Sequence, residues 1–270
     1  MVFNEDKFQL LRYGGNDELK LLTNYKAPNG RDINEDFHVK DLGVLMSSDG
    51  FFMTHVENLT NDCNRKIGWI LRTFHSRDIL TMKTLFKSLV LSRVDYCSPL
   101  IHPTLNAATT IKIEDIQRAF TRKISNMKSH SYWERLKLLG MHSIERRRER
   151  FIIIYMFKIL NNLVPNPGVH FKDSMRNGIT ANVPLVPTNR PTIYKSLRYH
   201  HFNFIGPKLF NILPPDLRCF STDSDNVVLA FKNKLDTFLS RIPDQPTTYG
   251  MQRQATSNSL FDQQYYISNA

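Results

Sequence analysis

The sequence predicts an α+β fold that is predominantly α, and three observations lead to this prediction. Short apolar runs in the first 46 residues are separated by glycine and asparagine, which is typical of strands joined by turns. From about residue 53 apolar residues recur at spacings of three or four, which indicates helices. After residue 163 the chain is irregular and rich in Pro and Asn until a last amphipathic stretch. We therefore expect small antiparallel strands at the N-terminus (about 1–46), a helical bundle and a mixed C-terminal extension.

Three N-terminal segments have the composition of strands. The stretches KFQLLRYG and LKLLTNY are separated by Gly14-Gly15-Asn16, and a second turn signal stands at Pro28-Asn29-Gly30. The stretch FHVKDLGVLM follows and is expected to be a third strand that closes a small antiparallel sheet.

Five helices with short connections are predicted between residues 53 and 163. Asp78 is suited to cap the second helix, which is expected to end near Pro99. Ser131 and Glu134 fit a capping box for the fourth helix, and Ser143 is suited to cap the fifth. The apolar faces of the first and third helices are formed by Val56, Leu59, Cys63, Ile67, Ile70 and Phe74, and by Ile113, Ile116, Phe120 and Ile124.

The C-terminal part is expected to be more irregular. The stretch FNFIGPKLFNILPPDLR places eight large apolar residues around two proline breaks, and residues 226–240 are expected to form a last amphipathic helix. From Pro243 the chain turns polar, which predicts disorder. We therefore predict four segments: 1–50 (β-rich), 51–165 (helical), 166–246 (C-terminal extension) and 247–270 (polar tail).

The composition and the missing motifs exclude several classes of protein. The apolar fraction of 41% predicts a folded chain, and the longest apolar run, Phe151 to Phe157, is too short to span a membrane. We expect no secretory signal at the N-terminus. Three widely spaced cysteines do not form a disulfide framework, so an intracellular protein is expected, nuclear or cytoplasmic. No P-loop, GxSxG or GxGxxG occurs, and the nine histidines lack partners at metal-ligand spacing.

Positive charge is concentrated in the middle of the chain. Residues 62–150 carry 18 Lys/Arg against 8 Asp/Glu, whereas residues 1–61 carry 6 against 10. A basic segment of this kind favours a polyanionic partner.

The stretch SIERRRERF, residues 143–151, is the densest part of this basic segment. With Ser143 as the cap, the arginines oppose the helix dipole, so a phosphate at the helix end would find free N–H groups together with Arg146, Arg147 and Arg150. The alternative is a solvated helix start that Glu145 and Glu149 partly neutralise. The following run to Leu160 is predicted to be a buried central helix.

Two further basic groups are candidates for phosphate contacts. Arg65, Gly68, Trp69 and Arg72 fall on one stripe of the first helix, away from its apolar face, which places an indole between two guanidinium groups. The alternative is that Trp69 packs against a neighbouring helix. Arg122 and Lys123 lie beside the apolar face of the third helix, as part of an ordinary helix surface or as phosphate contacts.

Several segments in order resemble the C-terminal part of reverse transcriptases from non-LTR retrotransposons of the LINE-like, jockey type. The resemblance is carried by FHVKDLGVLMSSDGFFMTHV, NRKIGWILRTF, LFKSLVLSRVDYCSPL, IEDIQRAFTRKI, YWERLKLLGMHSIERRRERF and FKNKLDTFLSRIPDQP. It implies that VKDLGV is the last palm hairpin, that the helices form a thumb, and that the thumb grips a template–primer duplex.

The sequence departs from this family at its catalytic centre. Such polymerases hold two divalent metals, such as Mg²⁺, with adjacent aspartates, and no Asp-Asp dipeptide occurs here. The resemblance therefore implies a fragment without catalytic residues or cofactor of its own, which binds an RNA–DNA hybrid or RNA, and whose other partner would be the missing palm and fingers. A structural remnant of a mobile element, or a helical protein-interaction module, remains the alternative.

Overall fold

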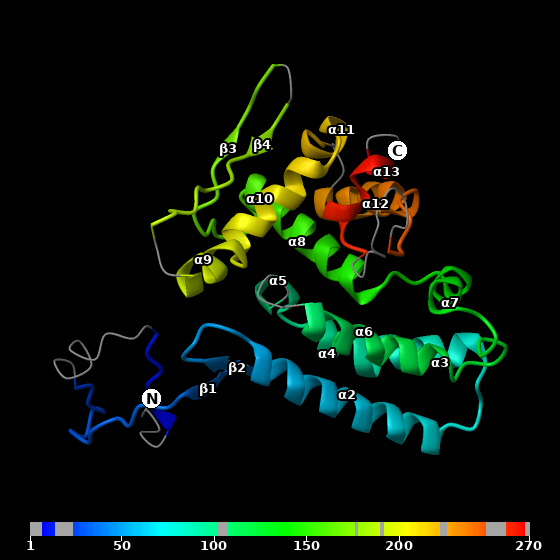
Figure 1. Ribbon diagram of the computed structural model, residues 1–270, viewed down its shortest axis with the longest axis horizontal. Coiled ribbons are helices and arrows are strands. Elements are labelled where there is room, and N and C mark those ends of the chain that lie inside the picture. Colours follow the sequence, from blue (N-terminus) through cyan, green and yellow to red (C-terminus); the bar gives the residue numbers. More distant parts are fainter. Residues whose placement is uncertain are drawn as a thin grey trace. The chain divides into compact units, whose positions relative to one another are not determined.

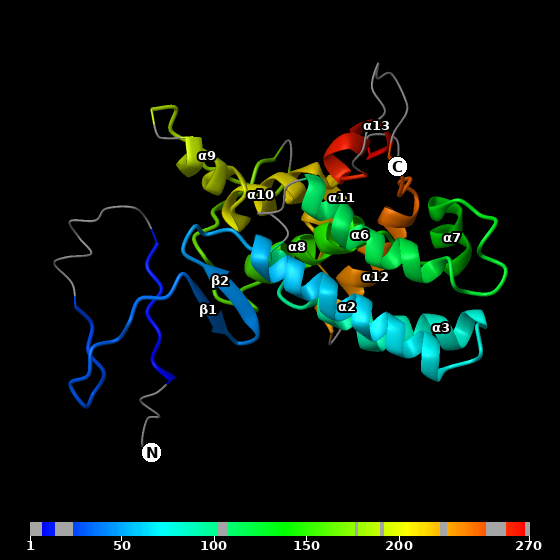
Figure 2. The ribbon, with the colours of Figure 1, turned by 60° about the horizontal axis from the view of Figure 1, so that its bottom comes forward.

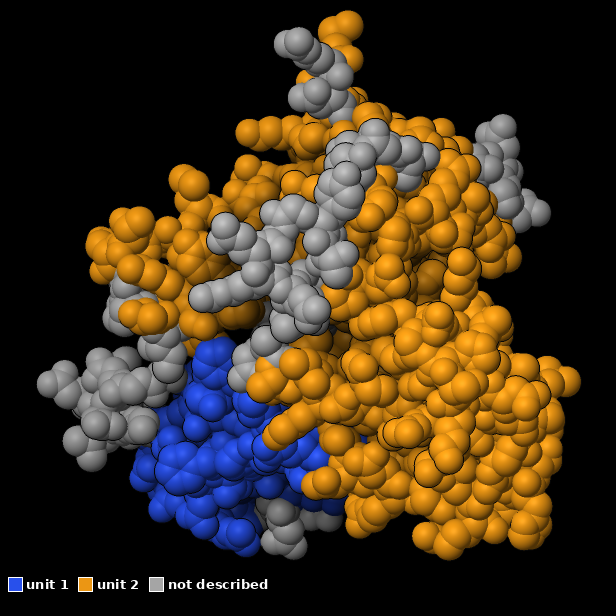
Figure 3. All heavy atoms as spheres, turned by 45° about the vertical axis from the view of Figure 1, so that its right-hand side comes forward, with its two compact units in different colours: residues 1–59 blue, residues 60–270 orange. Residues whose placement is uncertain are grey.

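The computed structural model confirms an α+β fold that is predominantly helical (Figure 1, Figure 2). It describes residues 7–13, 24–101, 107–175, 178–189, 192–221, 226–246 and 258–267. The chain divides into two compact units, residues 1–59 and 60–270, which Figure 3 colours separately. The boundary between them falls between Leu59 and Thr60, inside helix α2, which runs from Met53 to Thr73.

The strand expected over FHVKDLGVLM is instead a hairpin, as the family resemblance implied. Strands β1 (His38–Asp41) and β2 (Val44–Ser47) pair antiparallel, with Asp41 opposite Val44. Leu42 and Gly43 connect them, and both have positive φ angles, of 46° and 86°. Two consecutive residues with positive φ form the tight turn whose twist matches that of a β-hairpin. The Leu42-Gly43 pair therefore reverses the chain within the segment that was predicted to be one strand.

The first predicted strand is wrong over its described residues. Between residues 7 and 13 the only β contact is an isolated parallel bridge from Leu10 to Glu35. The stretch is apolar enough for a strand, but a strand also requires a continuous partner, and the contact with Glu35 is a single bridge. Most of the second predicted strand, LKLLTNY, lies outside the described residues.

The helical region follows the prediction closely. Its helices are α2 (Met53–Thr73), α3 (Ile79–Phe86), α4 (Ser92–Asp95), α5 (Ser98–Ile101), α6 (Ala107–Thr121), α7 (Tyr132–Leu139) and α8 (Ile144–Leu160). Asp78 accepts a hydrogen bond from the Thr81 amide, which confirms it as the cap of α3. The capping box of α7 and the Ser143 cap of α8 are also confirmed.

The second predicted helix is not one continuous α-helix that ends near Pro99. A π-helical turn, Lys87–Leu91, joins α3 to α4, and the chain leaves the helix at Tyr96 and Cys97, which has a φ of 52°. Pro99 does not end a helix, because it lies in the first turn of α5, where a missing N–H costs nothing.

The C-terminal region contains more regular structure than the sequence indicated. Its elements are β3 (Phe171–Lys172), β4 (Thr180–Ala181), α9 (Thr192–Tyr199), α10 (Phe202–Ile212), α11 (Pro215–Arg218), α12 (Val227–Ser240), a 3₁₀ turn (Leu260–Gln263) and α13 (Gln264–Ile267). Pro207 lies inside α10 and does not break it, whereas Pro214 and Pro215 do separate α10 from α11.

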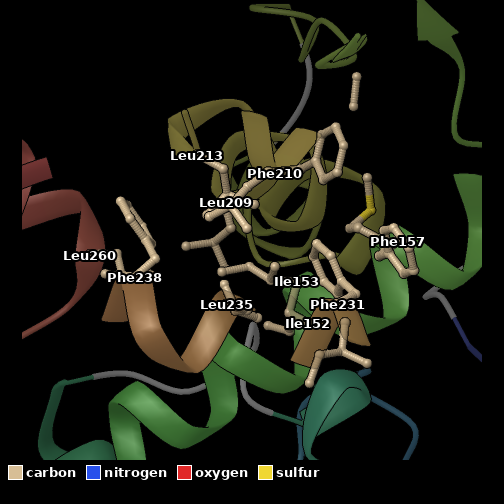
Figure 4. Close-up of a cluster of buried hydrophobic side chains, with 14 of the residues drawn as sticks. Ile152, Ile153, Phe157, Leu209, Phe210, Leu213, Phe231, Leu235, Phe238 and Leu260 are labelled. Atoms are coloured by element: carbon tan, nitrogen blue, oxygen red, sulfur yellow. The ribbon is translucent and has the colours of Figure 1, made fainter. Parts of the chain in front are cut away.

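Helix α8 is the buried centre of this region, as predicted. Its apolar half packs against α10 and α12, and Figure 4 shows the interdigitated side chains. Phe157 of α8 stacks on Phe231 of α12, with ring centroids 3.8 Å apart and ring planes 2° from parallel. Both side chains are fully buried. The stack therefore joins α8 and α12 through two residues that are 74 positions apart in the chain.

The prediction of a disordered tail is wrong for residues 258–267. Leu260 is fully buried in the apolar cluster of α8, α10 and α12. Asn258 and Gln263 are buried as well. A polar composition favoured disorder, but Leu260 is inserted into the core and Phe261, Tyr266 and Ile267 pack against it. These contacts, together with polar side chains that find partners, hold this segment.

Truncating the aromatic stack should destabilise the protein strongly. Phe157→Ala leaves a cavity and removes an aromatic pair, so we expect a loss of about 3–5 kcal/mol in the free energy of unfolding. Urea unfolding followed by circular dichroism measures it. Leu229→Ala on α12 is the control, since Leu229 is 52% exposed, and it should change stability by less than about 0.5 kcal/mol. Equal losses in the two variants would contradict the packing described here.

Candidate nucleic-acid interface

The stripe predicted on α2 is exposed to solvent. Trp69 is 44% exposed, and Arg65 and Arg72 are exposed on either side of it along the helix. Trp69 makes an edge contact with the ring of Phe74, 6.0 Å between centroids, so one side of the indole rests on the protein. The alternative prediction was that Trp69 packs against a neighbouring helix. The ring contact that is seen is with Phe74, which directly follows the end of α2.

The cation at the Trp69 ring is not the one that the stripe predicted. The amine of Lys66 lies 5.4 Å from the centroid of the Trp69 ring. Arg65 instead forms an ion pair with Asp62, one turn earlier in α2. Lys66 is three residues before Trp69, a spacing that brings side chains together on a helix. This spacing could have identified Lys66 from the sequence.

A second helix adds charge to this surface. Arg93 of α4 lies 3.8 Å from the carboxylate of Asp62. These residues line a shallow hollow of about 330 Å³. The lining residues are Asp62, Arg65, Lys66, Trp69 and Arg93. We call this set, together with the exposed Arg72 one turn after Trp69, the α2 surface. Arg93 is distant in sequence, and no local pattern could have placed it here.

Gly68 does not leave an open path to the backbone of α2. An added Cβ atom at this position would lie 3.4 Å from Nη1 of Arg72, so that guanidinium group covers the glycine. The side chain of Arg72 is flexible and can move away at little cost. Gly68 and Arg72 are therefore close together, as the stripe predicted.

The start of α8, where a phosphate was expected, is occupied by carboxylates of the chain itself. Glu114 of α6 accepts hydrogen bonds from the amides of Ile144 and Glu145, at 3.1 and 3.2 Å. Asp244 accepts from the amide and the hydroxyl of Ser143, both at 2.7 Å. These two carboxyl groups occupy the positive end of the helix dipole, where we had expected a phosphate.

The three arginines predicted at this helix end are all engaged inside the protein, so this part of the predicted interface is corrected. Arg146 is fully buried, and its guanidinium donates to the carbonyls of Pro243 and Asn258. Arg147 forms an ion pair with Asp95, and Arg150 forms one with Asp236 of α12. Partners far away in sequence satisfy these charges, which the local pattern could not reveal.

The sequence reasoning did not predict that two ionisable groups of the same turn, Arg148 and Glu149, are buried. Arg148 is fully buried, which lowers its pKa to about 10, although Asp95, Glu114 and Glu145 favour its charge. Burial also raises the pKa of Glu149 to about 8 and that of Glu114 to about 7. Glu149 accepts hydrogen bonds from the hydroxyl of Ser259 and the amide of Leu260, and so it holds the C-terminal segment.

Asp244 behaves differently from the other two carboxyl groups. Burial alone would raise its pKa, but hydrogen bonds from His142 and Ser143 and the charge of Arg146 hold it below its usual range. This group therefore remains an anion at the helix start at neutral pH, and it gives Arg146 a charged neighbour.

The remaining predicted residues, Arg122 and Lys123, are exposed just after the end of α6. They lie on a different element from the α2 surface. Within the described residues no cluster of His, Cys, Asp and Glu could hold a metal ion. No described helix is both long and apolar enough to cross a membrane.

The chain was compared with known proteins at three levels. No protein-family model, curated protein or solved structure matches it.

The buried Glu149 should give the protein a defined pH dependence. Its carboxyl titrates near 4.5 when unfolded and near 8 when folded. The folded state therefore holds the proton more tightly, and this group's contribution to stability decreases as the pH rises from about 5 to 8. Glu149→Gln removes the titration, so the free energy of unfolding of the wild type, relative to this variant, should fall over that range.

Denaturant titrations at several pH values measure this difference. Asp262→Asn, at an exposed position of the same C-terminal segment, is the control. Its free energy of unfolding should differ from that of the wild type by the same amount at every pH. A constant difference between wild type and Glu149→Gln would show that Glu149 has the same pKa in both states.

Proposed function

We propose that this chain binds the sugar-phosphate backbone of nucleic acid through the α2 surface, without reading the base sequence. The observation that carries the proposal is the exposed indole of Trp69 beside Lys66, with Arg65, Arg72 and Arg93 around it. An aromatic ring among cations suits stacking on a base or sugar next to phosphate contacts. The concentration of positive charge in residues 62–150 supports the same partner.

We further propose that the chain is a fragment of a reverse transcriptase of a non-LTR retrotransposon, and that it is not catalytic by itself. The ordered segments that resemble this family support the proposal, and the missing Asp-Asp pair is the reason to expect no polymerase activity. An RNA–DNA hybrid is then the preferred ligand. Its shallow minor groove can be recognised by shape, which a surface with few base-reading groups requires.

Asp62 has a specific place in this proposal. Its carboxylate pairs with Arg65 and lies near Arg93, so it neutralises part of the α2 surface. A phosphate would have to compete with this carboxylate for the same guanidinium groups. The affinity for nucleic acid should therefore be limited by Asp62, and this gives the proposal a test in which binding increases.

Removing the exposed indole of Trp69 and the guanidinium of Arg72, one turn further along α2, should weaken the binding of nucleic acid. For Trp69→Ala/Arg72→Ala we expect an affinity for a short RNA–DNA hybrid lower by about tenfold or more, from lost stacking and one lost phosphate contact. The log–log slope against salt should become shallower by about 0.9. Fluorescence anisotropy at several salt concentrations measures both quantities.

A matched control exists on α9, where Arg198 and Tyr199 are an exposed cation and an exposed aromatic ring. Arg198→Ala/Tyr199→Ala removes the same charge and should bind the hybrid within about twofold of the wild type. If both double variants weaken binding equally, only the net charge matters and the α2 surface is not the site. A wild type without hybrid binding would favour the structural remnant.

Neutralising Asp62 should strengthen binding. Asp62→Asn frees Arg65 and Arg93 for phosphate, so we expect an affinity several-fold higher than that of the wild type at low salt. Asp216→Asn is the control, since Asp216 is also an exposed surface carboxylate paired with a cation, Lys234. The two variants have the same net charge. A similar gain in both would assign the effect to net charge alone.

A further inference from the structure

A second basic hollow lies where α6 ends and α7 begins, on helices that Figure 2 shows. Its volume is about 500 Å³. The lining residues are Asp115, Arg118, Ala119, Arg122, Lys128, His130, Tyr132 and Arg135. Four of these side chains are cations and one is a carboxylate. The carboxylate, Asp115, is already engaged with Arg118, at 3.1 Å from Nε.

Arg135 forms the built part of this hollow, because it is 95% buried and firmly held. Its guanidinium donates to the hydroxyl of Thr121 at 3.2 Å and to the carbonyls of His130 and Arg118 at 2.9 and 3.1 Å. All three acceptors are neutral. Three of the five N–H groups of the guanidinium are used in these bonds, so two are left for a ligand.

The ring of Tyr132 fixes the positions of two of the cations. The guanidinium carbons of Arg118 and Arg135 lie 4.5 and 5.6 Å from its centroid. The Tyr132 hydroxyl in turn bonds to the buried carboxyl of Glu114 and accepts from the amide of Gln117. The ring is therefore rigid, and the arrangement of charges does not need to form when a ligand arrives.

A purely structural role accounts for only part of this arrangement. Arg135 satisfies a carbonyl in the last turn of α6, and the negative helix end there offers about half a unit charge. That explains the presence of one arginine. It does not explain why Arg122 and Lys128 line the same hollow, since neither forms an ion pair with a carboxylate in the part of the chain that the structure describes.

We propose that this hollow binds a phosphate group, with Arg135 and Arg118 as fixed donors and with Arg122 and Lys128 as mobile ones. Guanidinium groups match the tetrahedral oxygens of phosphate and are the usual protein ligands for it. The phosphate can come from a free phosphate ion or from a nucleic-acid backbone. The site is independent of the α2 surface, because the two share no residue and lie on different helices.

The full-length protein tests this inference with two exposed substitutions that leave Arg135 and the fold untouched. For Arg122→Ala/Lys128→Ala we expect inorganic phosphate to bind at least about fivefold more weakly than to the wild type, measured by isothermal titration calorimetry. Arg198→Ala/Lys137→Ala removes the same charge from exposed positions elsewhere and should bind phosphate as the wild type does.

A second titration, with a short RNA–DNA hybrid, identifies the source of the phosphate. If the hollow variant weakens hybrid binding more than its control does, the ligand is a backbone phosphate. If the hollow variant lowers only the affinity for inorganic phosphate, the ligand is a free phosphate ion. The inference is overturned if neither ligand loses more affinity in the hollow variant than in the control. The α2 variants do not enter this comparison, so the two proposals can fail separately.

Discussion

The buried charge at the start of α8 is the constraint on which the rest of the helical unit depends. Carboxylates from α6 and from the segment after α12 cap the helix, while Arg146 reaches back to carbonyls of the C-terminal part. Each of these groups would cost several kcal/mol if it were buried alone. The carboxyl groups bond to the start of α8 and Arg146 bonds to carbonyls of the C-terminal part, which is possible only when α6, α8 and the C-terminal segment are all in place. This dependence makes the unit cooperative and fixes the directions of the helices that carry the exposed basic surfaces.

The sequence predicted the features that are local. The caps at Asp78, Ser131 and Ser143 and the apolar half of α8 are confirmed, because a cap or a periodic face depends on residues three or four positions apart. The hairpin at Leu42 was implied only by the family resemblance and not by the local residue pattern, since leucine rarely adopts a positive φ. The burial of the arginines in α8 was hidden for another reason, because their partners lie up to 112 residues away.

The candidate site shows the same division between local and distant information. Trp69, Arg65, Gly68 and Arg72 were found from their helical spacing, and the structure leaves the indole and both arginines exposed. Their electrostatic neighbours were not found. Asp62 turns Arg65 away from the indole, and Arg93 arrives from α4. The spacing of residues on one helix thus identified where the positive charge lies. The packing of α2 and α4 determines how many of these cations can contact a ligand.

The return of residues 258–267 to the start of α8 has a consequence for how the chain folds during synthesis. Glu149 and Arg146 emerge from the ribosome more than 100 residues before Ser259 and Asn258, which satisfy them. Until then the ribosome holds a chain in which the central helix can form but its charged end cannot be buried. The helical unit is therefore completed only after translation has passed residue 260, and until then the part of the apolar cluster that Leu260 covers stays open to chaperones.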